Sequence, residues 1–211
     1  MIRKQIVVLG ALLSLFLTSP ATAHHALGGS APISFMEGLL SGLAHPVINI
    51  DHLAFVIAIG VLTAVGQASK FLPVWFVAGS ILGTVLAVQG ILIPYAGWLA
   101  LVALVGIGVA LACGYKSLKF TDVIGFTIAG TLHGSVYADA VVGTVSSSLG
   151  GYLLGFAAVQ AVIASSAMMV VYMMWAGDRL YENARVLGGV VAGVGLTVMA
   201  QSAAAAFFSQ I

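Results

Sequence analysis

The stretch HPVINIDHLAF, His45 to Phe55, places two histidines and an aspartate inside an otherwise apolar run. Polar groups in such surroundings are costly unless they are paired or bind something. The chain as a whole is strongly apolar: 61% of its 211 residues are hydrophobic and 6% are charged, with a mean hydropathy of +1.16. Soluble domains carry roughly 25% charged residues. The composition therefore predicts an integral membrane protein with this stretch inside the bilayer.

Apolar runs of about 20 residues recur along the chain, and at 1.5 Å per residue each spans a hydrocarbon core of about 30 Å. Hydrocarbon offers no water to satisfy an open backbone, so these runs are expected to be helices. Six of them follow an amino-terminal leader, and the predicted fold is an all-α, polytopic membrane protein with six transmembrane helices. They run approximately from Phe35 to Val65, Leu72 to Ile93, Tyr95 to Gly114, Phe120 to Val142, Gly151 to Ala176 and Ala184 to Phe208.

The first 23 residues have the features of a cleaved signal peptide. Arg3 and Lys4 precede an apolar run from Ile6 to Leu17, and Ala21-Thr22-Ala23 has the small-x-small pattern of a signal peptidase site. An uncleaved first helix is the alternative interpretation. Residues 24–211 are expected to form a single transmembrane permease domain.

Three polar residues near the start of this domain are candidate metal ligands at the entrance of a transport path. Cleavage after the leader would place His24 and His25 at the new amino terminus, with two imidazoles beside a free amine. Glu37 lies near the outer end of the first apolar stretch, where it is either a surface residue or a further ligand.

The distribution of positive charge predicts the orientation in the membrane. The connections between apolar stretches alternate between basic and uncharged, and all basic residues after the leader fall on one side. They are Lys70, Lys116, Lys119, Arg179 and Arg185. The positive-inside rule assigns that side to the cytoplasm. We therefore predict a bacterial-type inner (cytoplasmic) membrane protein with both mature termini outside. Its surroundings are the lipid bilayer, and no basic patch indicates nucleic acid.

The first apolar stretch is too long for a single straight crossing. Phe35 to Val65 contains 31 residues, about 46 Å of continuous helix. Pro46 lacks an N–H donor and disfavours helical angles at the residue before it, and an asparagine three positions later is comfortable in a left-handed turn. We therefore expect a broken helix. Its first part ends at about Ala44, the chain unwinds over His45–Asn49, and a second helix runs from about Ile50.

The break determines whether the two histidines meet. On an unbroken helix His45 and His52 would lie about 10.5 Å apart, too far to share one ion bound at about 2.1 Å. Unwinding between them allows both imidazoles and the Asp51 carboxylate to converge. The alternative is that Asn49 or Asp51 caps the second helix while the histidines satisfy backbone groups. Ionisable groups inside a membrane segment are functional by default, which favours a binding site.

A second polar cluster lies in the fourth stretch. GTLHGSVYADA, Gly130–Ala140, carries His133 and Asp139, and like GLAHPVINIDH in the first stretch it reads Gly-x-x-His with an aspartate six residues after the histidine. This similarity predicts two repeat halves, residues 34–115 and 120–208. With three crossings each, the halves would be inverted relative to one another. Transporters built this way commonly bind substrate near the midplane on interrupted helices.

The two motifs resemble the signatures of a known family. His-x5-Asp-His in the first stretch and His-Gly-x-Val-x-Ala-Asp in the fourth are similar to those of the HupE/UreJ family of nickel and cobalt permeases. The resemblance implies secondary uptake of Ni²⁺ or Co²⁺, with His45, Asp51, His52 and His133 as metal residues. This chain has asparagine where the family usually has glycine, at position 49. It also has Asp139 where glutamate is typical, so its second cluster carries a shorter acid.

Ligand chemistry agrees with a transported metal ion. Imidazole and carboxylate without thiolate fit a borderline divalent ion, and Zn²⁺, Mn²⁺ and copper remain alternatives to nickel and cobalt. Asp51 and Asp139 together would neutralise one such ion. No prosthetic group is expected, and neither the Walker loop GxxxxGK[ST] nor the zincin motif HExxH occurs in the sequence. The prediction is therefore a permease rather than an enzyme. The alternatives are a membrane accessory or structural protein for metalloenzyme maturation and an intramembrane metal-dependent enzyme.

Overall fold

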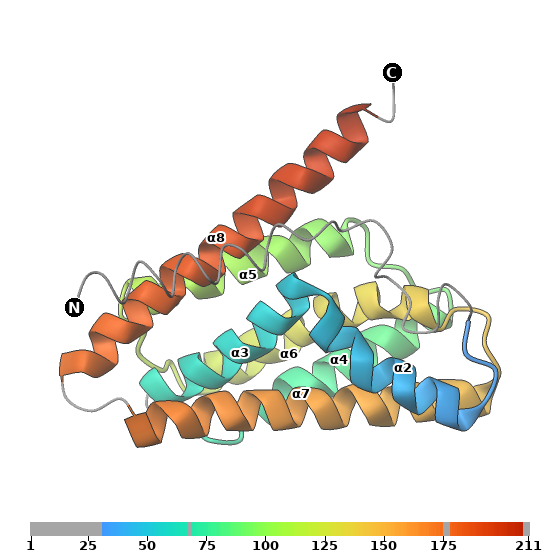
Figure 1. Cartoon of the computed structure of the whole chain (residues 1–211), viewed down its shortest axis with the longest axis horizontal. Helices are drawn as coiled ribbons and strands as arrows, with labels where there is room; N and C mark the ends of the chain where they lie inside the picture. The colour runs from blue at the N-terminus through green and yellow to red at the C-terminus, as the bar shows by residue number, and fades with distance from the viewer. Residues whose placement is uncertain (1–30, 67–68, 175–177, 209–211) are drawn as a thin grey trace.

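The computed structural model describes residues 31–66, 69–174 and 178–208, and every regular element in these ranges is helical (Figure 1). The all-α prediction is confirmed, whereas the leader lies outside the described residues. In chain order the elements are α2 (Phe35–Ile48), α3 (Ile50–Val65), α4 (Leu72–Val88), α5 (Ala96–Ala112), α6 (Phe120–Tyr137), the short 3₁₀ helix η1 (Ala138–Ala140), α7 (Ser146–Met174) and α8 (Asp178–Phe208).

Helix length supports part of the predicted topology. α7 and the segment Arg179–Phe208 of α8 are each long and apolar enough to cross a membrane, and α2 with α3 qualifies as one span bent by 81°. α4 and α5 are apolar but have 17 residues each, about 26 Å of helix. By length and composition the described helices thus include two spans, or three with the bent pair, and six crossings stay a prediction.

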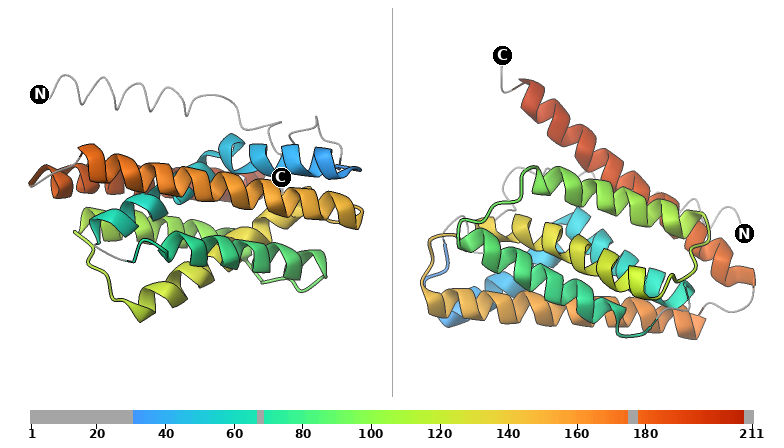
Figure 2. Two further views of the ribbon diagram at one scale, coloured as in Figure 1. Left: turned by 90° about the horizontal axis from the view of Figure 1, so that it is seen from below. Right: turned by 180° about the vertical axis from the view of Figure 1, so that it is seen from behind.

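Glycines bring α2 against α7 (Figures 1 and 2). A Cβ atom added at Gly38 would collide with the carbonyl oxygen of Ser148, and one at Gly42 would collide with that of Tyr152. Only a residue without a side chain fits such backbone contacts, which are typical of helix packing in membranes. Four residues further along α2, the contact on α7 also lies four residues further along, so the two helices run parallel.

The same type of contact joins α4 to α6. A Cβ atom at Gly79 would meet the carbonyl oxygen of Thr127, and one at Gly83 would meet that of Thr131. These two helices are therefore also parallel. α5 and α8 instead cross antiparallel, with Gly108 and Gly188 each facing the other's carbonyl oxygen. These directions are the ones that alternating crossings would produce.

The two parallel pairs share one packing register. In each pair both helices carry a small-x3-small glycine motif. The four motifs are Gly38/Gly42 in α2, Gly151/Gly155 in α7, Gly79/Gly83 in α4 and Gly130/Gly134 in α6. With the glycines of α2 and α6 superimposed, His45 corresponds to Tyr137. The two sequence motifs instead align His45 with His133, which lies one helical turn before Tyr137 in α6. The two alignments differ because helix packing matches the glycines, whereas the motifs match the histidines.

The break in the first stretch is sharper than the sequence predicts. α2 continues through Pro46 to Ile48, and the non-helical angles are confined to Asn49, which has φ −90° and ψ 116° and is extended rather than left-handed. The prediction that the chain unwinds over five residues is therefore wrong. A proline lacks the N–H donor of an ordinary helical residue and kinks the helix. The turn from His45 to Asn49 is closed here because Asn49 donates both its N–H and its Nδ2 to the His45 carbonyl, each at 3.5 Å.

α7 begins at Ser146, earlier than the predicted start at Gly151. The serine-rich segment looks like a connection in the sequence. In the structure Ser148 is buried, and its Oγ donates to the carbonyl of Pro32 at 2.9 Å. This hydrogen bond ties the first turn of α7 to the segment that precedes α2.

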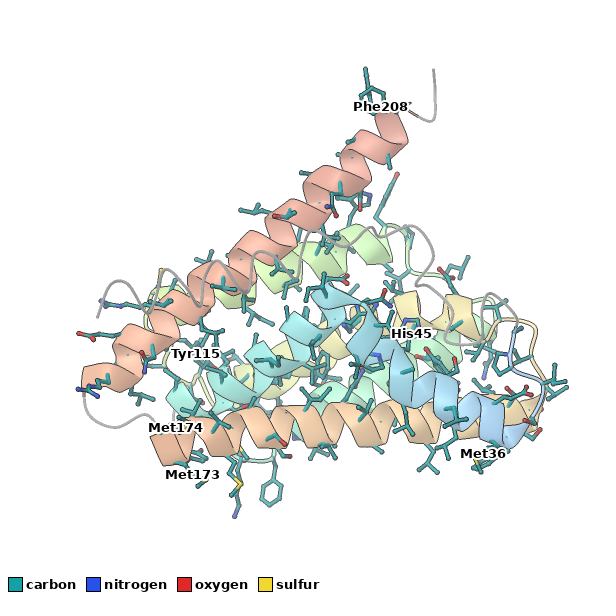
Figure 3. All side chains as sticks on the ribbon, viewed as in Figure 1. Met36, His45, Tyr115, Met173, Met174 and Phe208 are labelled. Atoms are coloured by element: carbon teal, nitrogen blue, oxygen red, sulfur yellow. The ribbon has the colours of Figure 1, made fainter. Side chains whose placement is uncertain are left out.

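Two other boundaries differ from prediction. α4 ends at Val88 rather than Ile93, because Gly90 adopts a positive φ of 82° that stops the helix. α8 begins at Asp178 rather than Ala184, so its polar first turns are helical and not a loop. At its other end α8 extends beyond the neighbouring helices to Phe208 (Figures 1 and 3).

Candidate metal centre

Three histidines meet at the break between α2 and α3. His45 lies in the last turn of α2 (Figure 3), and His52 lies in the first turn of α3. Their ring centroids are 5.6 Å apart. His133 of α6 approaches from the other half of the chain, with its ring centroid 4.5 Å from that of His52. The break therefore brings together the two predicted polar motifs.

The spacing of the rings is close to that of ligands sharing one ion. A metal bound at about 2.1 Å to an imidazole nitrogen lies about 3.2 Å from the ring centroid, so neighbouring ligands have centroids about 4.5–5.2 Å apart. The rings are not yet turned toward a common point. His45 and His52 stack at 17°, while His133 meets His52 at 71°. Within the described ranges, no three His, Cys, Asp or Glu side chains form a group that could hold a metal ion. Binding by these histidines would require side-chain rotation.

His133 is a buried imidazole with open hydrogen-bonding capacity. It is 2% exposed, and neither ring nitrogen has a hydrogen-bond partner among the described residues. Its ring contacts those of Phe55 and Phe76 at centroid distances of 4.6 and 5.8 Å. An unsatisfied buried polar group costs about 1–3 kcal/mol. A residue of this kind requires an explanation, and a ligand role supplies one.

Asp51 supplies a negative charge beside the rings. Its Oδ2 lies 3.5 Å from Nδ1 of His52, and its side chain is 23% exposed. It also occupies the first turn of α3, where the helix dipole stabilises a carboxylate. A carboxylate next to an imidazole orients the ring and raises its basicity toward a metal.

Tyr137 is the residue of this centre that the sequence did not identify. Its ring contacts all three histidines, with centroid distances of 4.8 Å to His45, 4.6 Å to His52 and 5.1 Å to His133. Tyr137 is fully buried, and its carbonyl accepts a hydrogen bond of 3.1 Å from the Tyr152 hydroxyl. The signal was available, because Tyr137 lies one helical turn after His133 inside the second motif. An aromatic residue in an apolar helix is, however, usually a packing residue.

Comparison with known proteins shows the family of this chain. A model of the HupE / UreJ protein family matches residues 11–198. The chain belongs to the HupE/UreJ family. Protein HupE of Rhizobium leguminosarum bv. viciae is 28% identical over 185 residues, which cover 87% of this chain and 93% of that protein. No solved structure matches the chain. HupE/UreJ proteins are associated with nickel and cobalt handling for hydrogenase and urease, and they are not a known enzyme family.

The other predicted ligands of this HupE/UreJ protein are Asp139, Glu37, His24 and His25. Asp139 is exposed on η1 and is close enough to Tyr152 to interact with it electrostatically. Glu37 belongs to the amino-terminal cap of α2, because its carboxylate accepts the N–H of Ile33 at 2.8 Å. His24 and His25 lie outside the described residues. Metal binding by these four residues stays a prediction.

A buried carboxylate of this HupE/UreJ protein, Asp122, has a structural role. Asp122 is 7% exposed and accepts hydrogen bonds from the Ser117 hydroxyl at 2.5 Å and from the N–H of Leu118 at 2.9 Å. Burial, together with the nearby negative charge of Asp122, raises the pKa of Tyr115 in the same connection. These partners satisfy the Asp122 carboxylate where α6 begins, which distinguishes it from the site carboxylate Asp51.

Proposed function

We propose that this HupE/UreJ protein is a permease, a secondary transporter that takes up a divalent transition-metal ion. Nickel or cobalt is the proposed substrate, bound within the membrane by His45, His52 and His133 with Asp51. The observation that carries the proposal is the cluster of three imidazoles around a helix break, where both nitrogens of His133 are open among the described residues.

The electrostatics of the break favour a cation. The negative end of the α2 dipole and the positive end of the α3 dipole, each equivalent to about half an elementary charge, both lie at the break and largely offset one another. Asp51 adds a carboxylate on the other side of the break. In transporters with discontinuous helices, such half-helix ends coordinate ions near the midplane. The Asp51 carboxylate lowers the heavy cost of holding a divalent ion away from water.

The glycine packing supports a transporter architecture. The α2–α7 and α4–α6 pairs share one packing register, and each pair joins helices from different halves of the chain. We propose that the halves are an inverted repeat and that the rings lie between them. Substrate sites at the interface of inverted repeats permit access from alternate sides by rocking of one half against the other.

The membrane potential is a sufficient driving force for the proposed uptake. Moving one elementary charge across 100 mV is worth about 2.3 kcal/mol, so a divalent ion gains about 4.6 kcal/mol on entry. An inside-negative potential would carry the ion toward the cytoplasm.

Uptake into sealed vesicles containing only this protein tests the proposal. Ni²⁺, Co²⁺, Zn²⁺ and Mn²⁺ are supplied in turn under an inside-negative potential. We expect accumulation of Ni²⁺ or Co²⁺ and its loss in His133→Ala. Glu182→Gln, an exposed carboxylate outside the ring cluster, is the control and should transport normally. Correctly inserted protein that accumulates none of the four ions would overturn the permease assignment and favour an accessory role.

A further inference from the structure

Gln160, near the middle of α7, is a fully buried amide. It is 0% exposed, and neither Oε1 nor Nε2 forms a hydrogen bond with any residue that the structure describes. A primary amide has two N–H donors and an acceptor oxygen to satisfy. Burying these groups unpaired costs about 1–3 kcal/mol. A residue useful only for packing would not need an amide at this position.

The polar neighbour of Gln160 is the Tyr137 hydroxyl. Phe156, one turn earlier on the same face of α7, packs on the Tyr137 ring with centroids 5.4 Å apart. Gln160 lies within interaction range of the Tyr137 hydroxyl. The two groups do not yet form a hydrogen bond, and the hydroxyl has no other hydrogen-bond partner in the described part of the chain. Two adjacent open polar groups therefore lie in an apolar core.

Tyr137 is placed to control how the histidines converge. Its ring contacts all three imidazoles, so any rotation of these rings toward a common point takes place against it. It is also the last residue of α6, immediately before η1. A helix end can adjust with less disruption of backbone hydrogen bonds than a helix interior.

We propose that Gln160 is a positioning residue of the metal site that acts through Tyr137. Its Oε1 accepts a hydrogen bond from the Tyr137 hydroxyl and holds the phenol ring toward α7 while His45, His52 and His133 bind the ion. The inference rests on the proposed function, because the ligand is the same divalent ion. It assigns to α7 a contribution to the site that the two sequence motifs do not contain.

Binding of Co²⁺ to the purified protein in detergent tests this inference, because the visible absorption of bound Co²⁺ reports both affinity and coordination geometry. Outer-shell partners typically contribute 10- to 100-fold to metal affinity. We expect Gln160→Leu and Tyr137→Phe each to weaken Co²⁺ binding about tenfold or more and to change the spectrum. Gln160→Glu keeps an acceptor oxygen and should bind at least as tightly as the unaltered protein. Gln89→Leu removes an exposed glutamine at the end of α4 and is the matched control.

The double variant separates positioning from a general structural effect. If Gln160 acts only through the Tyr137 hydroxyl, Gln160→Leu should weaken binding no further in a Tyr137→Phe background, because coupled residues are not additive. Additive losses, or unchanged affinity and spectrum in Gln160→Leu, would overturn the positioning role while leaving the permease proposal intact. Absence of Co²⁺ binding by the unaltered protein would overturn the proposed metal site and this inference with it.

Discussion

His52 and His133 lie with their ring centroids 4.5 Å apart and their planes at 71°, although they belong to different halves of the chain. His52 comes from the helix that follows the break, and His133 comes from α6, which packs along α4. The contact means that each half contributes an imidazole to the same buried centre. A change in how the halves pack would therefore alter the spacing between these two rings.

The first prediction concerns these two residues. His52→Ala and His133→Ala should each abolish metal uptake, because each removes an imidazole from the shared centre, and His45→Ala and Asp51→Asn should do the same. Radioactive ⁶³Ni²⁺ uptake into vesicles measures the effect, with membrane content of each variant determined by immunoblot. Normal uptake in any two of the four variants would remove this cluster from the transport path.

The second prediction concerns orientation. Single cysteines replace Ser69, in the basic connection after α3, or Ser147, in the first turn of α7, in a background where Cys113 is serine. Both positions are exposed. The positive-inside rule predicts that an impermeant thiol reagent labels the cysteine at 147 in intact cells and not the one at 69. The reverse pattern would require the opposite orientation, and labelling at 69 after permeabilisation serves as the control.

The sequence predicts where the site lies better than it predicts how the site is built. The apolar stretches and Pro46 indicate a broken first helix, because proline removes a donor wherever it occurs. The extent of the break depends on whether the carbonyl groups next to the proline find hydrogen-bond donors. Here Asn49 donates to the His45 carbonyl, and no local sequence pattern predicts that hydrogen bond. The predicted approach of His45 and His52 is confirmed by a ring separation of 5.6 Å.

Tyr137 and the packing register could not be read from the motifs. A tyrosine in an apolar helix has the same sequence context whether it fills a core or contacts three histidines, and the neighbouring helices determine which of these it does. The same is true of Gln160, whose importance depends on its burial beside a ring from another helix. Small-x3-small glycine motifs are typical of close helix contacts in membranes, but which motif packs on which helix is a property of the folded chain.

The third prediction concerns Asp139, the shorter acid in the second motif. We predict that Asp139→Asn loses uptake, because two carboxylates are needed to offset the charge of a divalent ion, and that Asp139→Glu retains it. Initial uptake rates over a range of Ni²⁺ and Co²⁺ concentrations test both variants. Because Asp139 is the exposed residue of η1, uptake at saturating metal distinguishes a ligand from an entrance residue. Nearly normal maximal uptake by the asparagine variant would exclude a two-carboxylate site and restrict Asp139 to the entrance.

The last prediction concerns the backbone contact between α4 and α6. A Cβ atom at Gly134, the residue after His133, would collide with the carbonyl oxygen of Ser80. Backbone atoms cannot rotate out of the way as a flexible side chain can, so the helices must separate. We expect Gly134→Ala to destabilise the protein by about 3 kcal/mol, the upper range for overpacking, and to weaken metal binding by shifting the neighbouring imidazole.

Gly125, on the same helix, provides the matched control for Gly134→Ala. Within 4 Å of a Cβ atom at this position the structure places no other atom of the described residues that would obstruct it. Alanine favours helix over glycine by about 1 kcal/mol, so Gly125→Ala should leave the thermal unfolding temperature unchanged or raise it. Unfolding curves of the two purified variants in the same detergent give the comparison directly. If Gly134→Ala unfolded at the same temperature as Gly125→Ala and bound Co²⁺ normally, the close α4–α6 contact would not be required to place His133.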